Sequence, residues 1–279
     1  MNEFDKERLD FAKFQKTAEK QCLPFFRRAL KKHIEPLMKY AENNGVDAIP
    51  SSSISTLLDN SVWGKTYDQV YSLIGSKFAR REYYNQKRLD TGAEEKGVID
   101  FLLNLWSQKL REYALQYTFN IQQELNDTTV RLIQEALGQD YELGLDAQGK
   151  LRLFFKKIRE QNYLRSLVIS RTESTTIANL GKDIGARSWL EESGSQGYHV
   201  WLGRIKNERQ THLAVNNTIV PLDTPFTVGG ELSLRPGDVN LSAAERINCR
   251  CTTSIFSETR YNSLINRGRI VDGKLVGAS

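Results

Sequence analysis

The sequence contains few of the residues that mark secreted, membrane-spanning or disulfide-stapled proteins. Only three of its 279 residues are cysteine, and Cys249 and Cys251 are separated by a single residue. This number and spacing do not resemble a disulfide framework, so we expect a protein of a reducing compartment. No run approaches the roughly 18 apolar residues that a membrane-spanning helix needs. The charged amino terminus lacks the apolar segment of a secretion signal, which predicts synthesis in the cytoplasm and no membrane partner.

The sequence also lacks a strong charge and a complete catalytic motif. Its net charge of +5 is mildly basic, and the excess is shared almost evenly by the two halves of the chain. No G-x-S-x-G motif is present, and nothing near His212 supplies both a nucleophile and an orienting carboxylate. Gly229 and Gly230 lack the spacing and the Lys-Ser/Thr pair of a phosphate-binding loop, so we predict a turn there. These absences favour a protein that is not an enzyme.

Helical periodicity dominates the first 180 residues. Apolar side chains recur at three- and four-residue steps over 3–43, then to about residue 88, and again over 98–137, which predicts long helices. Pro24 and Pro36 are expected to break or kink the first of these helices. Asp127 is expected to cap a separate helix that begins behind it. The turn-rich segment 41–53 is a candidate linker.

The residue composition of the sequence changes after about Gly181. Glycine, proline and asparagine punctuate short β-prone runs, and we predict strands at 198–202, 218–222 and 252–256. The predicted fold class is therefore α+β, mainly α, with a long helical body at 1–159 and a small α+β module at 160–256. Residues 257–279, which contain three glycines, are expected to form a partly ordered tail.

Two cysteines at C-x-C spacing form a candidate metal site. Cys249 and Cys251 can both reach one zinc ion, but two ligands do not complete a site. His212 is the best third candidate, ahead of Asp223 and Asp238. The alternative is that the cysteines are small buried apolar residues and that His212 makes a structural hydrogen bond or acts as a general base. Zinc is thus the one cofactor that we hypothesise.

Charged residues outside the cysteine segment give two further hypotheses. Arg171 is expected to pair with an acidic group of the carboxy-terminal module and to tie that module to the helical body. A basic face near the amino terminus is a candidate DNA contact, although a solvated helix face is the commoner reason for such a pattern. Its residues are Lys13, Lys16, Lys20, Arg27, Arg28, Lys31 and Lys32.

Five short motifs follow one another in the carboxy-terminal half. They are Arg171-Thr172-Glu173, Arg209-Gln210-Thr211-His212, Asp223-Thr224-Pro225-Phe226, Pro236-Gly237-Asp238 and Asn248-Cys249-Arg250-Cys251. Their combination and order resemble the conserved domain of the phage Mu F-like, or phage head-morphogenesis, minor head proteins. The resemblance covers about residues 160–255 and implies that the module at 160–256 is this head-morphogenesis domain.

The resemblance implies a low-copy minor capsid protein of a tailed bacteriophage, in the head interior near the portal. Such a protein acts in head assembly, and in some relatives in handling or delivery of packaged double-stranded DNA. Its expected partners are the portal protein and capsid or scaffold proteins. The alternative from another class is an injected enzyme, ADP-ribosyltransferase-like or acting on DNA, that uses Arg171 and His212 or Glu231. A zinc-stabilised binding module without catalysis is compatible with the first reading.

Overall fold

The computed structural model describes residues 3–92, 100–138, 145–203 and 208–277. The chain is α+β and mainly α, as the sequence predicts. It divides into two compact units, of which the first comprises Met1–Cys22, Val70–Glu112 and Arg171–Ser279, and the second comprises Leu23–Gln69 and Tyr113–Ser170. The predicted segment boundary between 159 and 160 lies inside helix α5. Among the described helices, none is both long and apolar enough to cross a membrane.

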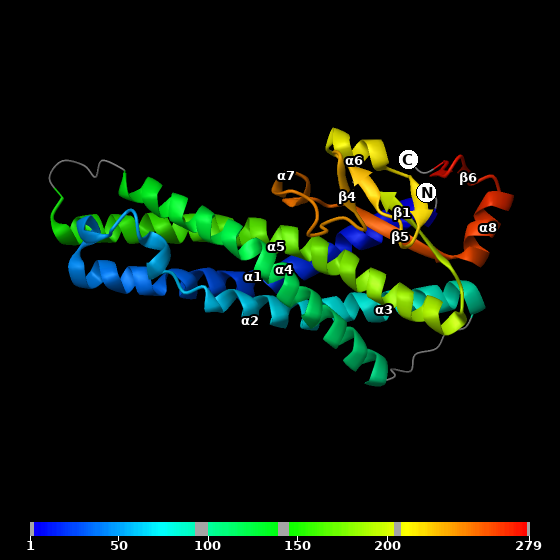
Figure 1. Cartoon of the computed structure of the whole chain (residues 1–279), viewed down its shortest axis with the longest axis horizontal. Helices are drawn as coiled ribbons and strands as arrows, with labels where there is room; N and C mark the ends of the chain where they lie inside the picture. The colour runs from blue at the N-terminus through cyan, green and yellow to red at the C-terminus, as the bar shows by residue number, and fades with distance from the viewer. Residues whose placement is uncertain (1–2, 93–99, 139–144, 204–207, 278–279) are drawn as a thin grey trace. The chain divides into compact units, whose positions relative to one another are not determined.

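Figure 1 labels the secondary-structure elements along the chain. The helices are α1 (Glu3–Asn44), α2 (Ser61–Val70), α3 (Ser76–Thr91), α4 (Asp100–Leu137), α5 (Ala147–Ser193), α6 (Gln210–Val215), α7 (Ala243–Arg246) and α8 (Glu258–Asn266), with short helical turns η1 (Val46–Ala48) and η2 (Ile54–Leu57) and a π-helical segment η3 (Tyr71–Gly75). The strands are β1 (Gly197–Leu202), β2 (Ile219–Pro221), β3 (Phe226–Val228), β4 (Glu231–Ser233), β5 (Thr252–Ser257), β6 (Ile270–Val271) and β7 (Lys274–Leu275). The three predicted strand segments are confirmed as β1, β2 and β5.

Two predicted helix breaks do not occur. Helix α1 continues through Pro24 and Pro36, and both prolines are exposed, so the carbonyls that lose a helical hydrogen bond lie on the solvent side. Helix α4 continues through Asp127, which accepts a hydrogen bond from Gln123 at 2.7 Å one turn earlier instead of capping a new helix. Buried apolar side chains on both sides of each position keep the helices continuous.

The second unit is helical. Its apolar core joins α1, α4 and α5, and buried members include Leu37, Ile133 and Phe154. The candidate linker at 41–53 lies inside this unit, where Val46 and Ile49 belong to the same core. The turns after α1 therefore close the unit, because their apolar side chains complete its packing.

The first unit is built around a three-stranded antiparallel sheet with strand order β2-β1-β5. Val200 pairs with Ser254 and Trp201 pairs with Thr253, so neighbouring side chains of β1 and β5 face opposite sides of the sheet. On one side, Ile255 packs against Ala186 and Leu190 of α5. The adjacent β3–β4 hairpin turns at Gly229 and Gly230, whose φ angles of 58° and 87° confirm the predicted turn.

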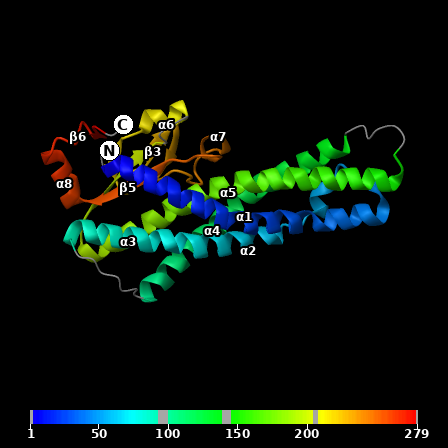
Figure 2. The same ribbon diagram turned by 180° about the vertical axis from the view of Figure 1, so that it is seen from behind.

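The segment expected to be a partly ordered tail contains α8 and the β6–β7 hairpin. Leu264, Ile270 and Leu275 of this segment are buried in the core on the other side of the sheet. Phe4 of α1 joins the same core, and Figure 2 shows the start of α1, in blue, beside β5. Both ends of the described chain thus pack on one sheet face.

Helix α5 approaches α3, and the end of η3 before it, closely at glycines. A Cβ atom on Gly185 would lie 2.0 Å from the carbonyl oxygen of Ala79, and a Cβ atom on Gly181 would lie 2.5 Å from the carbonyl oxygen of Gly75. Both contacts are with backbone, which cannot swing aside as a flexible side chain can. The separation of these two helices in the first unit therefore depends on residues without a side chain.

We expect Gly185→Ala to lower the free energy of unfolding by about 1–3 kcal/mol, because the added methyl group forces the two helix backbones apart. The matched control is Gly64→Ala in α2, where a Cβ atom would meet nothing within 4 Å. That change should raise stability by about 0.5–1 kcal/mol, since alanine has the higher helix propensity. Urea unfolding followed by circular dichroism measures both. Equal effects of the two substitutions would contradict the close approach at Gly185.

Candidate metal centre

The first unit brings together the three residues that the sequence nominates as metal ligands. His212 lies on α6, and Cys249 and Cys251 lie on the segment between α7 and β5. The Nδ1 atom of His212 is 3.2 Å from the Cys251 sulfur and 3.7 Å from the Cys249 sulfur. One donor atom from each residue lies within 4.8 Å of the other two. These atoms could hold a metal ion.

A carboxylate fixes the orientation of the His212 ring. The Nε2 atom of His212 is 2.9 Å from Oε2 of Glu245, and Thr211 donates a hydrogen bond to the same oxygen at 2.8 Å. Trp201 meets the imidazole edge-on, with ring centroids 5.7 Å apart. In the tautomer that donates the Nε2 proton to Glu245, the lone pair of Nδ1 is directed toward the two sulfurs.

The sulfurs differ in their electrostatic surroundings. The pKa of Cys249 falls to about 5, because the Cys251 thiol hydrogen-bonds to its sulfur and His212 stabilises the thiolate, against the opposing effect of burial. Burial raises the pKa of Cys251, and the neighbouring Cys249 and Glu208 charges raise it further. Burial lowers the pKa of His212, but its contact with Cys249 reverses this effect and the net pKa is raised. The surroundings therefore favour the thiolate form at Cys249 and the thiol form at Cys251.

Burial limits what this arrangement can do chemically. Exposed fractions are 2% for His212, 3% for Cys249 and 2% for Cys251. A thiolate beside an imidazole is a nucleophilic pair in many enzymes, but a nucleophile must be reachable by its substrate. Thiolate and imidazole ligands away from solvent are instead typical of structural metal sites. The geometry favours the binding role over the general-base role for His212.

Polar side chains along one face of α5 hold the cysteine segment by its backbone. Thr175 donates a hydrogen bond to the carbonyl of Cys249 at 2.5 Å. Asn179 donates to the carbonyl of Cys251 at 3.1 Å and accepts from the amide of Thr253 at 3.2 Å. We call Thr172, Thr175, Asn179 and Lys182 the α5 polar stripe; all four are buried.

The two ends of the α5 polar stripe hold the ends of the same segment. Thr172 accepts a hydrogen bond from the amide of Asn248 at 3.1 Å, and Lys182 donates to the carbonyl of Thr253 at 2.5 Å. Asn248 has a φ angle of 60°, a left-handed conformation that asparagine tolerates better than most residues. The chain thus turns at Asn248 and then follows the helix, which places both sulfurs.

The arginines of the motifs connect the same region. Arg209 donates to the carbonyls of Glu245 and Ile247, the first at 2.8 Å, and so ties the start of α6 to the end of α7. Arg250 forms an ion pair with Glu19 of α1 at 2.8 Å. Each of these arginines holds one segment of the first unit against another.

Arg171 bonds differently from the prediction. Its guanidinium donates to the side-chain oxygen of Asn248 at 3.3 Å, and its ion-pair partner is Glu19 at 3.4 Å. The acidic partner therefore lies on α1 rather than in the carboxy-terminal module, and the tie to the module is an amide. Glu173, the third residue of that motif, accepts a hydrogen bond from Tyr71 at 2.8 Å and is buried.

Asp223 and Asp238 do not join the metal cluster. Asp223 pairs with Arg187 of α5 at 2.7 Å and is exposed. Asp238 accepts hydrogen bonds from the amides of Leu234 and Asn240 at 3.1 and 3.3 Å, which closes a turn. Asp223 thus forms a surface ion pair and Asp238 stabilises a backbone turn.

Sequence reasoning missed Glu245, Thr175, Asn179 and Lys182. The sequence does carry a signal for the three residues on α5, because Thr175, Asn179 and Lys182 recur at three- and four-residue steps among small and apolar neighbours. Such a pattern is typical of a helix face that must satisfy polar groups inside a core. No comparable signal marks Glu245, which reaches His212 only through the fold.

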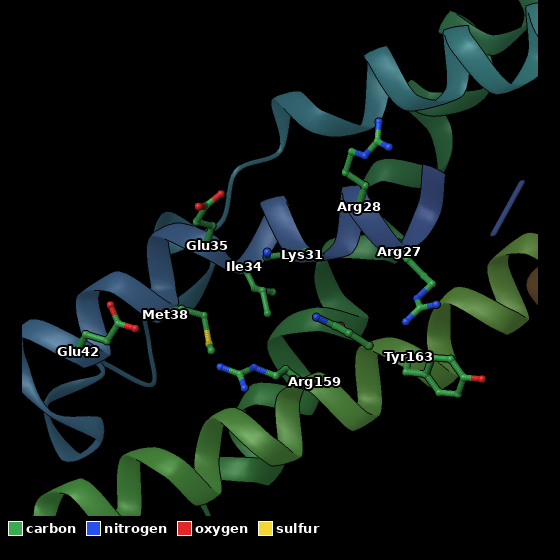
Figure 3. Close-up of a pocket in the computed structure, with 10 residues that line it drawn as sticks. Arg27, Arg28, Lys31, Ile34, Glu35, Met38, Glu42, Arg159 and Tyr163 are labelled. Carbon is green, nitrogen blue, oxygen red and sulfur yellow. The ribbon is translucent and has the colours of Figure 1, made fainter. Parts of the chain in front are cut away.

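The seven candidate DNA-contact residues are all exposed and divide between the two units. Lys13, Lys16 and Lys20 belong to the first unit, and Arg27, Arg28, Lys31 and Lys32 to the second. In the second unit, a cavity of about 670 Å³ is lined by Arg27, Arg28, Lys31 and Arg159, with Glu35 and Glu42 at its edge. Figure 3 shows these side chains on α1 and α5 around Ile34, Met38 and Tyr163.

The guanidinium of Arg27 stacks on the Tyr163 ring, 5.2 Å from its centre. The cavity therefore combines an apolar floor with a cationic rim. This combination suits an anionic group that is attached to a flat or apolar body.

Comparisons with known proteins give two partial relatives. The chain is 25% identical over 163 residues to the NAD(+)–arginine ADP-ribosyltransferase EFV of Enterococcus faecalis, a match that covers 55% of this chain and 31% of that protein. It is 23% identical over 179 residues to the uncharacterized protein YqbB of Bacillus subtilis, a match that covers 62% of this chain and 49% of YqbB. The chain thus spans about a third and about half of these relatives. No family model and no solved structure matches it.

We expect Asn179→Ala to lower the free energy of unfolding of the first unit by about 2–4 kcal/mol, because two buried backbone groups lose a hydrogen-bond partner. The control is Glu191→Ala, an exposed position on the same helix, which should change stability by less than about 0.5 kcal/mol. Urea unfolding followed by tryptophan fluorescence, in a Trp63→Phe background that leaves Trp106, Trp189 and Trp201, reports on this unit. A neutral Asn179→Ala variant would show that the stripe does not stabilise the fold.

Proposed function

We propose that this chain is a portal-associated minor head protein of a tailed bacteriophage, which acts in head assembly. The observation that carries the proposal is the meeting of the motifs in the first unit. Arg171 and Thr172 contact Asn248, and His212 lies 3.2 and 3.7 Å from the sulfurs of Cys251 and Cys249. All five motifs on which the family resemblance rests lie in the first unit, and three of them contact one another there.

The bonding of these residues supports a structural role. Motif side chains donate to backbone carbonyls or pair with charges of neighbouring elements, as Arg209 and Arg250 do. A catalytic group needs a free functional atom facing a cleft. The described residues of the first unit line a cavity of about 380 Å³, with Glu7, Glu82 and Lys182 in its wall, and no motif residue lines it. A module whose motif side chains are engaged in this way is suited to present its surface to a larger assembly, here the portal and neighbouring capsid or scaffold proteins.

The partial match to the transferase is compatible with this proposal. A segment covering 31% of that protein can be a module shared by proteins with different activities. The same match makes an injected ADP-ribosyltransferase-like enzyme the second candidate. Its nominated residues are engaged, however: Arg171 with Glu19, His212 with Glu245, and Glu231 with the amide of Ser242. None of the three lines the cavity of the first unit.

Quantitative mass spectrometry of purified virions and procapsids tests the assembly role. We expect a few copies of the chain per particle, recovered together with the portal protein when particles are disrupted. The control is a non-structural protein from the same infected cells, which should be depleted from the particles. Absence of the chain from particles, together with cleavage of NAD by the purified protein, would favour the enzyme.

The cationic cavity of the second unit supports a role in DNA handling. Arg28, Lys31 and Arg159 line one cavity, and Arg27 stacks on Tyr163 in its wall. Four cationic side chains face two carboxylates there, which leaves a local positive field. Phosphate groups of packaged double-stranded DNA are the abundant anions inside a phage head, and we propose that this surface contacts them.

A matched pair of triple variants tests this contact. We expect Arg28→Gln, Lys31→Gln and Arg159→Gln together to weaken binding to duplex DNA and to reduce the slope of log affinity against log salt by about 3, about one per lost phosphate contact. Lys13→Gln, Lys16→Gln and Lys20→Gln together remove the same charge from the first unit and should have a smaller effect. Fluorescence anisotropy at several salt concentrations measures both, and equal losses would count against a site at the cavity.

A further inference from the structure

A fourth donor atom lies beside the three clustered ligand residues. The Cys251 sulfur lies within hydrogen-bond distance of Oε1 of Glu208, at 2.8 Å. Glu208 is two residues before α6 and reaches inward past Gly203, where a Cβ atom would lie 2.0 Å from its Oε2. The absence of a side chain at residue 203 is thus what gives the carboxylate room.

The geometry points to a structural zinc site formed by Cys249, Cys251, His212 and Glu208. The proposal goes beyond the head function and does not depend on it. Zinc would bind both sulfurs as thiolates and Nδ1 of His212 as a neutral imidazole nitrogen, and the protons that it displaces would pass to solvent. Four protein ligands would close the coordination sphere and leave no position for substrate, as in structural rather than catalytic sites.

The distances fit one tetrahedral ion. With zinc–sulfur and zinc–nitrogen bonds of about 2.3 and 2.0 Å, tetrahedral angles place nitrogen and sulfur about 3.5 Å apart. The observed separations from His212 Nδ1 are 3.2 and 3.7 Å, on either side of that value. The Glu208 carboxylate lies 2.8 Å from the Cys251 sulfur but outside the group of donor atoms that lie within 4.8 Å of one another, so it must move to exchange its hydrogen bond for a metal bond.

The surroundings supply the groups that such a site requires. Glu245 holds the Nε2 atom of His212 at 2.9 Å, the carboxylate–histidine arrangement that orients a zinc-bound ring. Two thiolates and one carboxylate around a divalent ion leave one negative charge. Arg8, which also pairs with Asp5 at 3.2 Å, lies near Glu208 and Cys251 and offsets part of this charge. Hydrogen bonds to Asn216 and Asn217, at 3.2 and 2.8 Å, hold Arg8 in place.

The choice of metal follows from the donor atoms. Thiolate and imidazole ligands favour zinc over magnesium, calcium or manganese, which prefer oxygen. Iron–sulfur clusters usually need four cysteines, and this cluster offers two. The local core around Trp201, Phe226 and Val228 is small, so a metal ion would add a crosslink where little apolar surface is buried.

Metal analysis of the full chain tests the proposal. After expression with zinc and removal of loosely bound ions, we expect about one zinc per chain. Cys249→Ser and Cys251→Ser should each abolish tight binding, whereas Cys22→Ser, at a buried cysteine outside the cluster, should leave it unchanged. Retention of zinc by both cluster variants, or no zinc in the unmodified chain, would overturn the site.

Cobalt substitution gives a spectrum of the unmodified chain, so it tests the coordination geometry even if a variant fails to fold. The unmodified chain with Co²⁺ should show tetrahedral d–d bands and thiolate-to-metal charge transfer from two sulfurs. Glu208→Gln should alter the d–d bands, because a ligand changes. Glu245→Gln should leave them unchanged while weakening metal binding by about 10–100-fold, the usual effect of losing an orienting partner. Unchanged bands in Glu208→Gln would remove Glu208 from the ligand set. An octahedral spectrum in the unmodified chain would refute the tetrahedral site.

Discussion

Hydrogen bonds from the α5 polar stripe to the backbone of 248–253 are the interactions on which the first unit depends. Asn179 satisfies both the carbonyl of Cys251 and the amide of Thr253, and Thr172 holds the amide of Asn248. Cys251 and Thr253 are buried in the core, where α5 rather than water is the partner of their backbone groups. The α5 polar stripe therefore supplies hydrogen-bond partners for the backbone of the cysteine segment, as a neighbouring strand would in a larger sheet.

The placement of the functional side chains follows from this anchoring. Once the segment is fixed along α5, the sulfurs of Cys249 and Cys251 meet His212, and Glu245 behind the imidazole sets its orientation. Strand β5 then continues from Thr252 into pairing with β1. One helix face thus determines both the candidate metal centre and the edge of the sheet, which explains why motifs far apart in sequence occur together.

Local patterns predicted part of this structure. Periodicity located the long helices and β1, β2 and β5, and the C-x-C spacing with His212 anticipated the cluster. The helix breaks predicted at Pro24 and Pro36 and the helix start predicted behind Asp127 were wrong, because packing on both sides of each residue outweighs the local signal for a helix end. Glu208, Glu245 and the ion pair of Arg171 with Glu19 could not be predicted, since each contact joins segments that only the fold brings together. Contacts of this kind leave no trace in local composition.

Hydrogen–deuterium exchange at the amides of Asn248 and Thr253 tests most directly whether the α5 polar stripe holds the cysteine segment. Both amides donate to side chains of α5 rather than to a strand, at 3.1 and 3.2 Å. If the stripe anchors the segment, they should exchange as slowly as the amides of β1, through unfolding of the whole unit. Rapid exchange at both positions while β1 stays protected would contradict this account.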